Sequence, residues 1–446
     1  MNNLTNDFSK GNIINHIVKL AVPMMLAQLV NILYNIIDRI YIGRIPVDAT
    51  NALTGLGVVF PICTVTIAFA NLVSSGATPL FSMERGKGNN EEAGRLMGNS
   101  FVMLIFLGLV ISILVNLFKR PLLLLLGASD TTYGYADSYI SIYMMGNVFV
   151  MLSLGLNAFI NAQGFAKTGM VTVSIGAVLN ILLDPVFIFY FNMGVKGAAL
   201  ATIISQFFAA IWTLWFLLGK RTIIRLSYKN FKLDFKRVIN ILSLGLAGFT
   251  MAITNSLVQM VCNINLSTYG GDIYIGAMTV INSIRELAMM PVTGIERSAQ
   301  PIISFNYGAT ENHRVKKTIK YSAYILLSVT SLTWIIIMLF AKQFILMFNQ
   351  DAELLNIGVK SMHIYFFGFF MMTFQFIGQI AFTALGRSKK AIFFSLLRKV
   401  FIVIPLTFIL PMVIGVDGVF YAEPISNFIG GTACCLTMYL TEYKKL

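Results

Sequence analysis

The sequence predicts an all-α polytopic membrane protein with twelve transmembrane helices, arranged as two six-helix lobes related by a pseudo-twofold axis along the membrane normal. The composition is the first reason: 57% of the 446 residues are hydrophobic and 12% are charged, and the mean hydropathy is +0.77. These values lie far from those of soluble domains. Apolar runs of membrane-spanning length are the second reason. They predict helices over residues 15–43, 52–82, 96–118, 136–160, 168–190, 197–219, 238–266, 275–305, 318–340, 358–383, 391–413 and 419–441.

An internal repeat is the third reason, because the two halves match at a nearly constant offset. Pairs 222 positions apart are Pro79 and Pro301, Ser82 and Ser304, Gly86 and Gly308, Gly146 and Gly368, and Gly164 and Gly386. Repeats with six spans each, an even number, share one orientation in the membrane. We therefore expect an N-terminal six-helix lobe over residues 1–219, a basic cytoplasmic linker over 220–237 and a C-terminal six-helix lobe over 238–446.

The net charge is +14, but the basic residues are distributed over short loops and do not form one patch. This distribution indicates how the chain is oriented in the membrane and does not indicate a nucleic-acid partner. Loops on one side, including the linker, carry Arg85, Lys87, Arg95, Lys167, Lys220, Arg221, Arg225, Lys229, Lys232, Lys236, Arg237, Arg314, Lys316, Lys317, Arg387, Lys389 and Lys390. Loops on the other side carry Arg44, Lys119, Arg120, Lys196, Lys342 and Lys360. By the positive-inside rule both termini are cytoplasmic. No cleavable leader is recognised, so we expect a multi-pass protein of a prokaryotic cytoplasmic membrane.

The first expected helix carries a polar stripe. Gln28, Asn31, Tyr34, Asn35 and Asp38 recur at steps of three and four residues, which places them on one helix face. An ionised Asp facing lipid costs several kcal/mol on the most lenient scale, about 2.5–3.5 kcal/mol. The stripe is therefore expected to face protein or a water-filled cavity. Amides alone are equally typical of hydrogen bonds between helices, but an intramembrane carboxylate indicates a functional site.

A second acid lies on the fifth expected helix. Asn180 and Asp184 are one turn apart, and Pro185 follows them and removes a backbone donor. Thr202 lies near the start of the sixth helix and Asn157 lies on the fourth. Carboxylate, amide and hydroxyl oxygens suit protons or Na⁺ and do not suit soft transition metals. We expect no cofactor, and the four cysteines show neither metal-ligand spacing nor a disulfide framework.

The second half lacks this acidic pair. In the repeat alignment Asp38 falls on Cys262 and Asp184 on Leu406, while Asn31 and Asn35 fall on Asn255 and Gln259. Its own intramembrane charges are Arg285, Glu286, Glu296, Arg297, Arg398, Lys399 and Glu423. One interpretation is that they close the lobe interface or reach to its ends; another is that Glu286 faces the cleft and contacts cationic substrate. Further candidates for a broad, adaptable cavity include Met290 and Gln375, although such residues are equally typical of helix packing.

Three segments of the chain resemble those of a known family. The stretch from Asp38 to Gly43 (D-x-x-x-x-G), NILLDP at Asn180 to Pro185 and QPIISFNYGA at Gln300 to Ala309, with the twelve-helix duplication, resemble the multidrug and toxic compound extrusion (MATE) family over essentially the whole chain. The resemblance implies export of amphipathic, often cationic compounds in exchange for H⁺ or Na⁺. It also implies that Asp38, Asn180, Asp184 and Thr202 form the cation site of the DinF-like and MepA-like prokaryotic branch. The acids of the other prokaryotic branch have no counterpart, because the seventh helix has Asn255 and Gln259 and the tenth has Gln375 and Gln379.

The sequence therefore predicts a cation-coupled antiporter that works by alternating access, with small amphipathic substrates, H⁺ or Na⁺ and membrane lipid as partners, and we expect a monomer. The alternative transport hypothesis is a flippase for a lipid-linked saccharide or peptidoglycan precursor. Arg285, Arg297 and Arg398 support it, because arginine binds pyrophosphate well. An enzyme is not expected, because no acidic Mg²⁺ cluster, nucleophile motif or phosphate-binding glycine loop is found.

Overall fold

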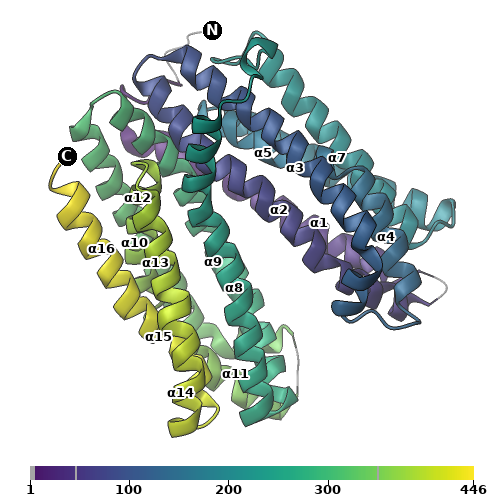
Figure 1. The fold of residues 1–446 in the computed structure, drawn as a ribbon. Coiled ribbons are helices and arrows are strands. Elements are labelled where there is room, and N and C mark those ends of the chain that lie inside the picture. The colour runs from purple at the N-terminus through teal and green to yellow at the C-terminus, as the bar shows by residue number, and fades with distance from the viewer. Residues whose placement is uncertain (1–5, 46–47, 349–350) are drawn as a thin grey trace. The chain divides into compact units, whose positions relative to one another are not determined.

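The structure is a computed structural model that describes residues 6–45, 48–348 and 351–446, and within these ranges it contains helices and connecting turns and no strand. Positions 1–5 and 46–47 of the predicted N-terminal lobe, and 349–350 of the C-terminal lobe, lie outside the described residues. The order of elements (Figure 1) is α1 (Ile13–Ile42), α2 (Ala49–Gly86), α3 (Asn90–Leu125), α4 (Tyr133–Met145), α5 (Asn147–Ala162), α6 (Ala166–Pro185), η2 (Val186–Tyr190), α7 (Val195–Leu218), η3 (Tyr228–Asn230), α8 (Phe235–Gly270), α9 (Asp272–Gly308), α10 (Asn312–Leu346), α11 (Ala352–Tyr365), η4 (Phe369–Met371), α12 (Met372–Ala384), α13 (Ser388–Leu396), η5 (Leu397–Val403), α14 (Ile404–Ile414), α15 (Asp417–Ser426), η6 (Asn427–Gly431), α16 (Thr432–Met438) and η7 (Tyr439–Tyr443).

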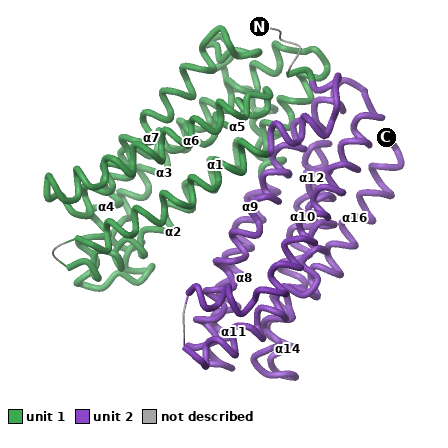
Figure 2. Tube along the Cα trace, turned by 180° about the vertical axis from the view of Figure 1, so that it is seen from behind, with its two compact units in different colours: residues 1–7, 22–245 green, residues 8–21, 246–446 purple. Residues whose placement is uncertain are grey.

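The chain forms two compact units (Figure 2). Unit 1 comprises Met1–Asp7 and Val22–Gly245, and unit 2 comprises Phe8–Ala21 and Leu246–Leu446. The divisions fall inside α1 and α8, so each of these long helices contributes to both units. The division into an N-terminal lobe that ends at residue 219 and a C-terminal lobe that begins at residue 238 stays a prediction.

A helical segment occupies each of the twelve expected positions. By length and composition, nine helices of the described chain can cross a membrane, and the bent pair α4 and α5 makes a tenth. The two segments outside this set are α9, which carries Asp272, Arg285, Glu286, Glu296 and Arg297, and the terminal run from Asp417 to Tyr443. Two π-helical turns, η6 and η7, interrupt that terminal run.

Two expected helices are broken where continuous helices were predicted. The helix expected over 136–160 bends by 57° at Gly146, between α4 and α5. A Cβ at Gly146 would lie 2.2 Å from Ile203 Cγ2 of α7, so the chain there needs a residue without a side chain. The helix expected over 358–383 breaks at Gly368, whose φ of +66° is favourable for glycine alone. The repeated glycine pair therefore marks the same break in both units.

Unit 1 is built on close helix packing around α2. The rings of Phe81 on α2 and Phe159 on α5 meet edge to face, with centroids 5.2 Å apart, in a core of fully buried apolar residues. Gly76 and Gly245 let α2 and the start of α8 touch through their backbones, because a Cβ on Gly76 would lie 1.9 Å from Ile241 O. Such approaches are typical of small residues at membrane helix interfaces.

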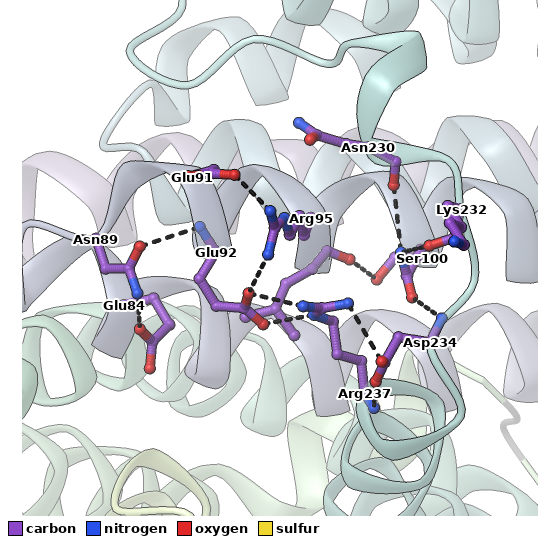
Figure 3. Close-up of polar contacts among 12 residues, drawn as sticks. Glu84, Asn89, Glu91, Glu92, Arg95, Ser100, Asn230, Lys232, Asp234 and Arg237 are labelled. Carbon is purple, nitrogen blue, oxygen red and sulfur yellow. Dashed lines mark hydrogen bonds and ion pairs between the residues drawn. The ribbon is translucent and has the colours of Figure 1, made fainter.

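The basic segment before α8 is fixed to α3 (Figure 3). The fully buried Asn99 donates from Nδ2 to Lys232 O at 2.9 Å and accepts at Oδ1 from Asp234 N at 3.0 Å. Arg237 donates two hydrogen bonds to the Glu92 carboxylate, from Nε to Oε1 at 2.5 Å and from Nη2 to Oε2 at 2.9 Å. This segment is therefore held in unit 1 by backbone contacts and a bidentate ion pair.

Unit 2 holds its own ends by charged contacts. Arg314 of α10 donates to the backbone carbonyls of Phe8, Lys10 and Gly11. At the other end, the Glu442 carboxylate accepts from Arg387 at 2.9 Å and from Lys390 at 2.5 Å. Burial opposes ionisation of Glu442, but these two hydrogen bonds hold the pKa of its carboxyl below the usual value.

Replacing Asn99 with alanine is expected to lower the free energy of unfolding by about 1–3 kcal/mol, because buried backbone groups of the 230–234 segment lose their partner. A denaturant titration of the purified protein measures the change. Asn116→Ala is the matched control, since the exposed Asn116 on the same helix bonds only to Ser112 O. An equal loss in both variants would contradict this account of the segment.

Glu442→Gln is expected to lower the thermal midpoint at neutral pH and to have less effect in acid. A carboxyl with a lowered pKa stabilises the fold above its unfolded-state pKa, near the ordinary 4.5, and this stabilisation is lost as the pH falls through the folded-state pKa. Thermal scans of wild type and variant from pH 7 downward test this. The midpoints should converge below about pH 4.5; a constant difference would show that the ion pairs do not contribute.

Candidate functional site

The most deeply buried carboxyl of unit 1 is Asp184, with 0% of its surface exposed. Asn180, one turn earlier on α6, donates from Nδ2 to Asp184 Oδ1 and to Thr202 Oγ1 of α7, both at 3.3 Å. The Thr202 hydroxyl donates a hydrogen bond to Ala198 O at 3.0 Å. The three residues predicted from the fifth and sixth helices are thus brought together.

Asp38 of α1 completes the group, because its carboxyl lies near enough to Asp184 for the two to interact electrostatically. One oxygen of each, Oδ1 of Asp38 and Oδ2 of Asp184, is buried without a hydrogen-bond partner. Asn180 Oδ1 is likewise buried and unpartnered. Two adjacent carboxylates repel each other, so the pair is stable only when a proton or another cation lies between them. We refer to Asp38, Asn180, Asp184 and Thr202 as the acidic site.

The local backbone explains how these helices meet. α6 ends at Pro185 and continues as the π-helical turn η2, because proline offers no N–H to continue the α-helical ladder. Gly197, in the first turn of α7, packs directly on that turn: a Cβ there would lie 2.7 Å from Phe187 C. The close approach fixes Thr202 of α7 beside Asn180 of α6.

Two tyrosines that the sequence analysis missed also belong to this region. Tyr139 and Tyr143 of α4 are buried, with stacked rings whose centroids lie 6.0 Å apart. Tyr139 interacts electrostatically with Asp38, and Tyr143 interacts electrostatically with Tyr34 of α1 and Cys63 of α2. Their spacing of four residues on one helix face was the available signal. It does not, however, reveal which neighbouring helix they meet.

The polar stripe of α1 is partly buried along its length. Tyr34 interacts electrostatically with Asp38 and Asp184, and Asn35 Nδ2 donates to Asn31 O at 2.7 Å. Gln28 lies nearer the N-terminus of the same helix, and no hydrogen bond joins it to the acidic site in the described structure. Asn157 of α5 bonds instead to Gly169 O at 3.1 Å.

Unit 2 contains a second charged cluster, of opposite sign. Glu423 of α15 pairs with Lys399 at 3.0 Å, Arg398 at 3.5 Å and Arg285 of α9 at 3.8 Å. Arg398 and Lys399 are 3% and 2% exposed, so neither side chain reaches to solvent at an end of the lobe. The expectation that these charges close the lobe interface stays a prediction. Both residues lie in η5, a π-helical segment, and π-helical turns are frequent at functional sites.

A cavity of about 60 Å³ adjoins this cluster. Of the predicted cavity residues it contains Asn255 and Gln259 of α8. Gln375 lies in a smaller space of about 10 Å³ beside Arg398 and Lys399. Glu286 is exposed and Met290 is partly buried on α9, and neither lines these two spaces. The structure therefore does not bring Glu286 into the cavity of its own unit.

Long apolar helices, an internal repeat and a buried acidic site together define the class of polytopic membrane transporters. The MatE family model matches residues 23–186 and 247–409, one match in each half of the repeat. The chain therefore belongs to the MatE family, whose members are transporters and not enzymes. It is a multi-pass membrane protein of twelve spans in two lobes.

Relatives and solved structures agree with this assignment. The chain is 23% identical to the "Multidrug export protein MepA" of Staphylococcus saprophyticus over 433 residues, which is 97% of this chain and 95% of the relative. It is similar to the structure described as "Crystal structure of MATE in the bent conformation", with a TM-score of 0.93, 22% identity and coverage of 100% of this chain and 99% of that one. A structure described as the "Outward-facing conformation of a multidrug resistance MATE family transporter of the MOP superfamily" has a TM-score of 0.91, 22% identity and 99% coverage of both chains.

Proposed function

We propose that the protein is a cation-coupled antiporter, driven by H⁺ or Na⁺, that exports amphipathic and often cationic drugs or toxic compounds by alternating access. The acidic site carries the proposal, because two adjacent buried carboxyls need a cation and no ion pair within unit 1 supplies one among the described residues. The similarity to relatives named as multidrug export proteins supports the class of substrate.

The coupling residues of this mechanism are Asp38 and Asp184, and Asn180 and Thr202 complete the oxygen ligands. An entering cation neutralises the carboxyl pair and changes the relative stability of the two access states. Export follows if substrate and cation favour different states. Each unit charge carried inward gains about 2.3 kcal/mol per 100 mV of membrane potential.

The substrate is proposed to contact the polar stripe of α1 and amide and thioether side chains of both halves. This set comprises Gln28, Asn31, Tyr34, Asn35, Asn157, Asn255, Gln259, Glu286, Met290 and Gln375. We further propose that the protein acts as a monomer in the cytoplasmic membrane with both termini in the cytoplasm. Loop charge supports this orientation.

A flippase for a lipid-linked saccharide or peptidoglycan precursor is the second candidate. The observation in its favour is the meeting of Arg285 and Arg398 at Glu423 in unit 2, because arginines bind pyrophosphate through paired hydrogen bonds. Arg297, the third arginine of that hypothesis, is exposed on α9 and lies outside this cluster.

Asp38→Asn is expected to abolish gradient-driven efflux while leaving the protein folded. The amide cannot exchange a proton and binds Na⁺ more weakly than a carboxylate, and it relieves the repulsion with Asp184. The assay follows a fluorescent lipophilic cation in proteoliposomes under an imposed pH or Na⁺ gradient. Asp130→Asn, which changes an exposed loop acid in the same way, is the matched control and should transport normally.

Full export by Asp38→Asn would contradict the proposal that Asp38 couples export to the cation gradient. If neither gradient moves the cation in the wild type, drug efflux fails and the flippase becomes the leading candidate.

A further inference from the structure

The charged cluster of unit 2 is not electrically balanced. Three cationic side chains, those of Arg285, Arg398 and Lys399, converge on the single carboxylate of Glu423. Ions in a membrane interior are stable only when opposite charges or hydrogen bonds compensate for lost water. One carboxylate leaves a formal excess of two positive charges in this cluster.

The three cations differ in how well they are satisfied. Lys399 Nζ contacts both Glu423 oxygens, at 3.0 and 3.1 Å. Arg398 donates to Asn427 Oδ1 as well as facing Glu423. Arg285 approaches Glu423 only at 3.8 Å, and its Nε is buried without a hydrogen-bond partner. Arg285 is therefore the cation with unused hydrogen-bonding capacity.

No other acid in the described structure lines the cavity beside this cluster. The titratable side chains along it are Cys262, Arg285, Tyr365, Lys399 and Glu423. Glu286, which follows Arg285 on α9, interacts with it electrostatically, but its side chain is exposed and does not line the cavity. The excess positive charge is therefore not offset by a second carboxylate in the cavity.

The cavity has room for a ligand group at this position. Its volume of about 60 Å³ would hold roughly four water molecules, enough for one carboxylate or phosphate group. Amides of Asn255, Gln259 and Asn282 contribute to its wall, and their NH₂ groups are hydrogen-bond donors. Arg285 is reachable, because 23% of its side chain is exposed against 4% for Arg398 and 3% for Lys399.

We propose that the cavity of unit 2 binds the carboxylate or phosphate group of a small organic anion, with Arg285 as the principal contact and Lys399 as the second. The guanidinium offers paired donors suited to such oxyanions. The side-chain NH₂ groups of Asn255, Gln259 and Asn282 line the same space and add neutral donors for the anion's oxygens. All residues that line this cavity belong to unit 2. Asn255 and Gln259 are shared with the proposed substrate surface, whereas the anion contacts Arg285 and Lys399 are not.

Isothermal titration of the purified, detergent-solubilised full-length protein with benzoate at constant ionic strength tests the proposal. Benzylamine, which has the same ring and the opposite charge, is the control probe. Arg285→Gln is expected to weaken benzoate binding about tenfold or more, because a charge-assisted hydrogen bond is lost. Arg297→Gln removes the same charge from an exposed position of the same helix and should leave binding unchanged.

Glu423→Gln provides a second measurement of opposite sign. Removing the internal carboxylate leaves the cations uncompensated, so benzoate should bind this variant more tightly and raise its thermal midpoint more than that of the wild type. The proposal is overturned if benzoate does not bind the wild type, if benzylamine binds as well as benzoate, or if Arg285→Gln and Arg297→Gln bind benzoate equally.

Discussion

The electrostatic interaction between the carboxyl groups of Asp38 and Asp184 is the main physical constraint on the acidic site of unit 1. Asp38 and Asp184 come from helices far apart in the sequence, and each has an oxygen that no described group satisfies. Like charges at such close range in a poorly solvated site cannot both ionise without a compensating cation. Much of the surrounding structure serves this pair: Pro185 ends α6 beside Asp184, and the close packing of Gly197 brings Thr202 to Asn180.

The two repeats use one scaffold for opposite charges. Each has a helix broken at a glycine in the same repeat position, Gly146 in unit 1 and Gly368 in unit 2. The segments GVKGAALA from Gly194 and GVDGVFYA from Gly415 match at an offset of 221, which places Glu423 at the repeat position of Thr202. Glu423 is surrounded by cations. A duplicated fold can thus hold an acidic site and a basic one, since the helix framework depends on apolar packing and small residues and leaves the polar positions free to differ.

Much of the fold could be predicted because membrane-spanning runs and repeated glycines and prolines are local signals. Periodicity also placed Asp38 on the polar face of its helix and Asn180 and Asp184 on one face of theirs, and the family resemblance added Thr202. Hydrogen bonds join Asn180 to Asp184 and Thr202, and Asp184 interacts electrostatically with Asp38. Contacts of Tyr139 and Tyr143 could not be predicted, because a helix face does not identify its neighbour. The cluster at Glu423 was missed because the sequence does not reveal which side chain from another segment meets Arg398 and Lys399, and both reach the one carboxylate of Glu423.

The most direct test of the acidic site is a count of cations released when substrate binds. Purified protein is titrated with tetraphenylphosphonium while released protons are followed with a pH-sensitive dye and released Na⁺ with a radioactive tracer. The account predicts that wild type and Asp130→Asn release a bound cation and that Asp184→Asn does not. Equal release by Asp184→Asn, or none by the wild type, would contradict the claim that this carboxyl pair holds the coupling ion.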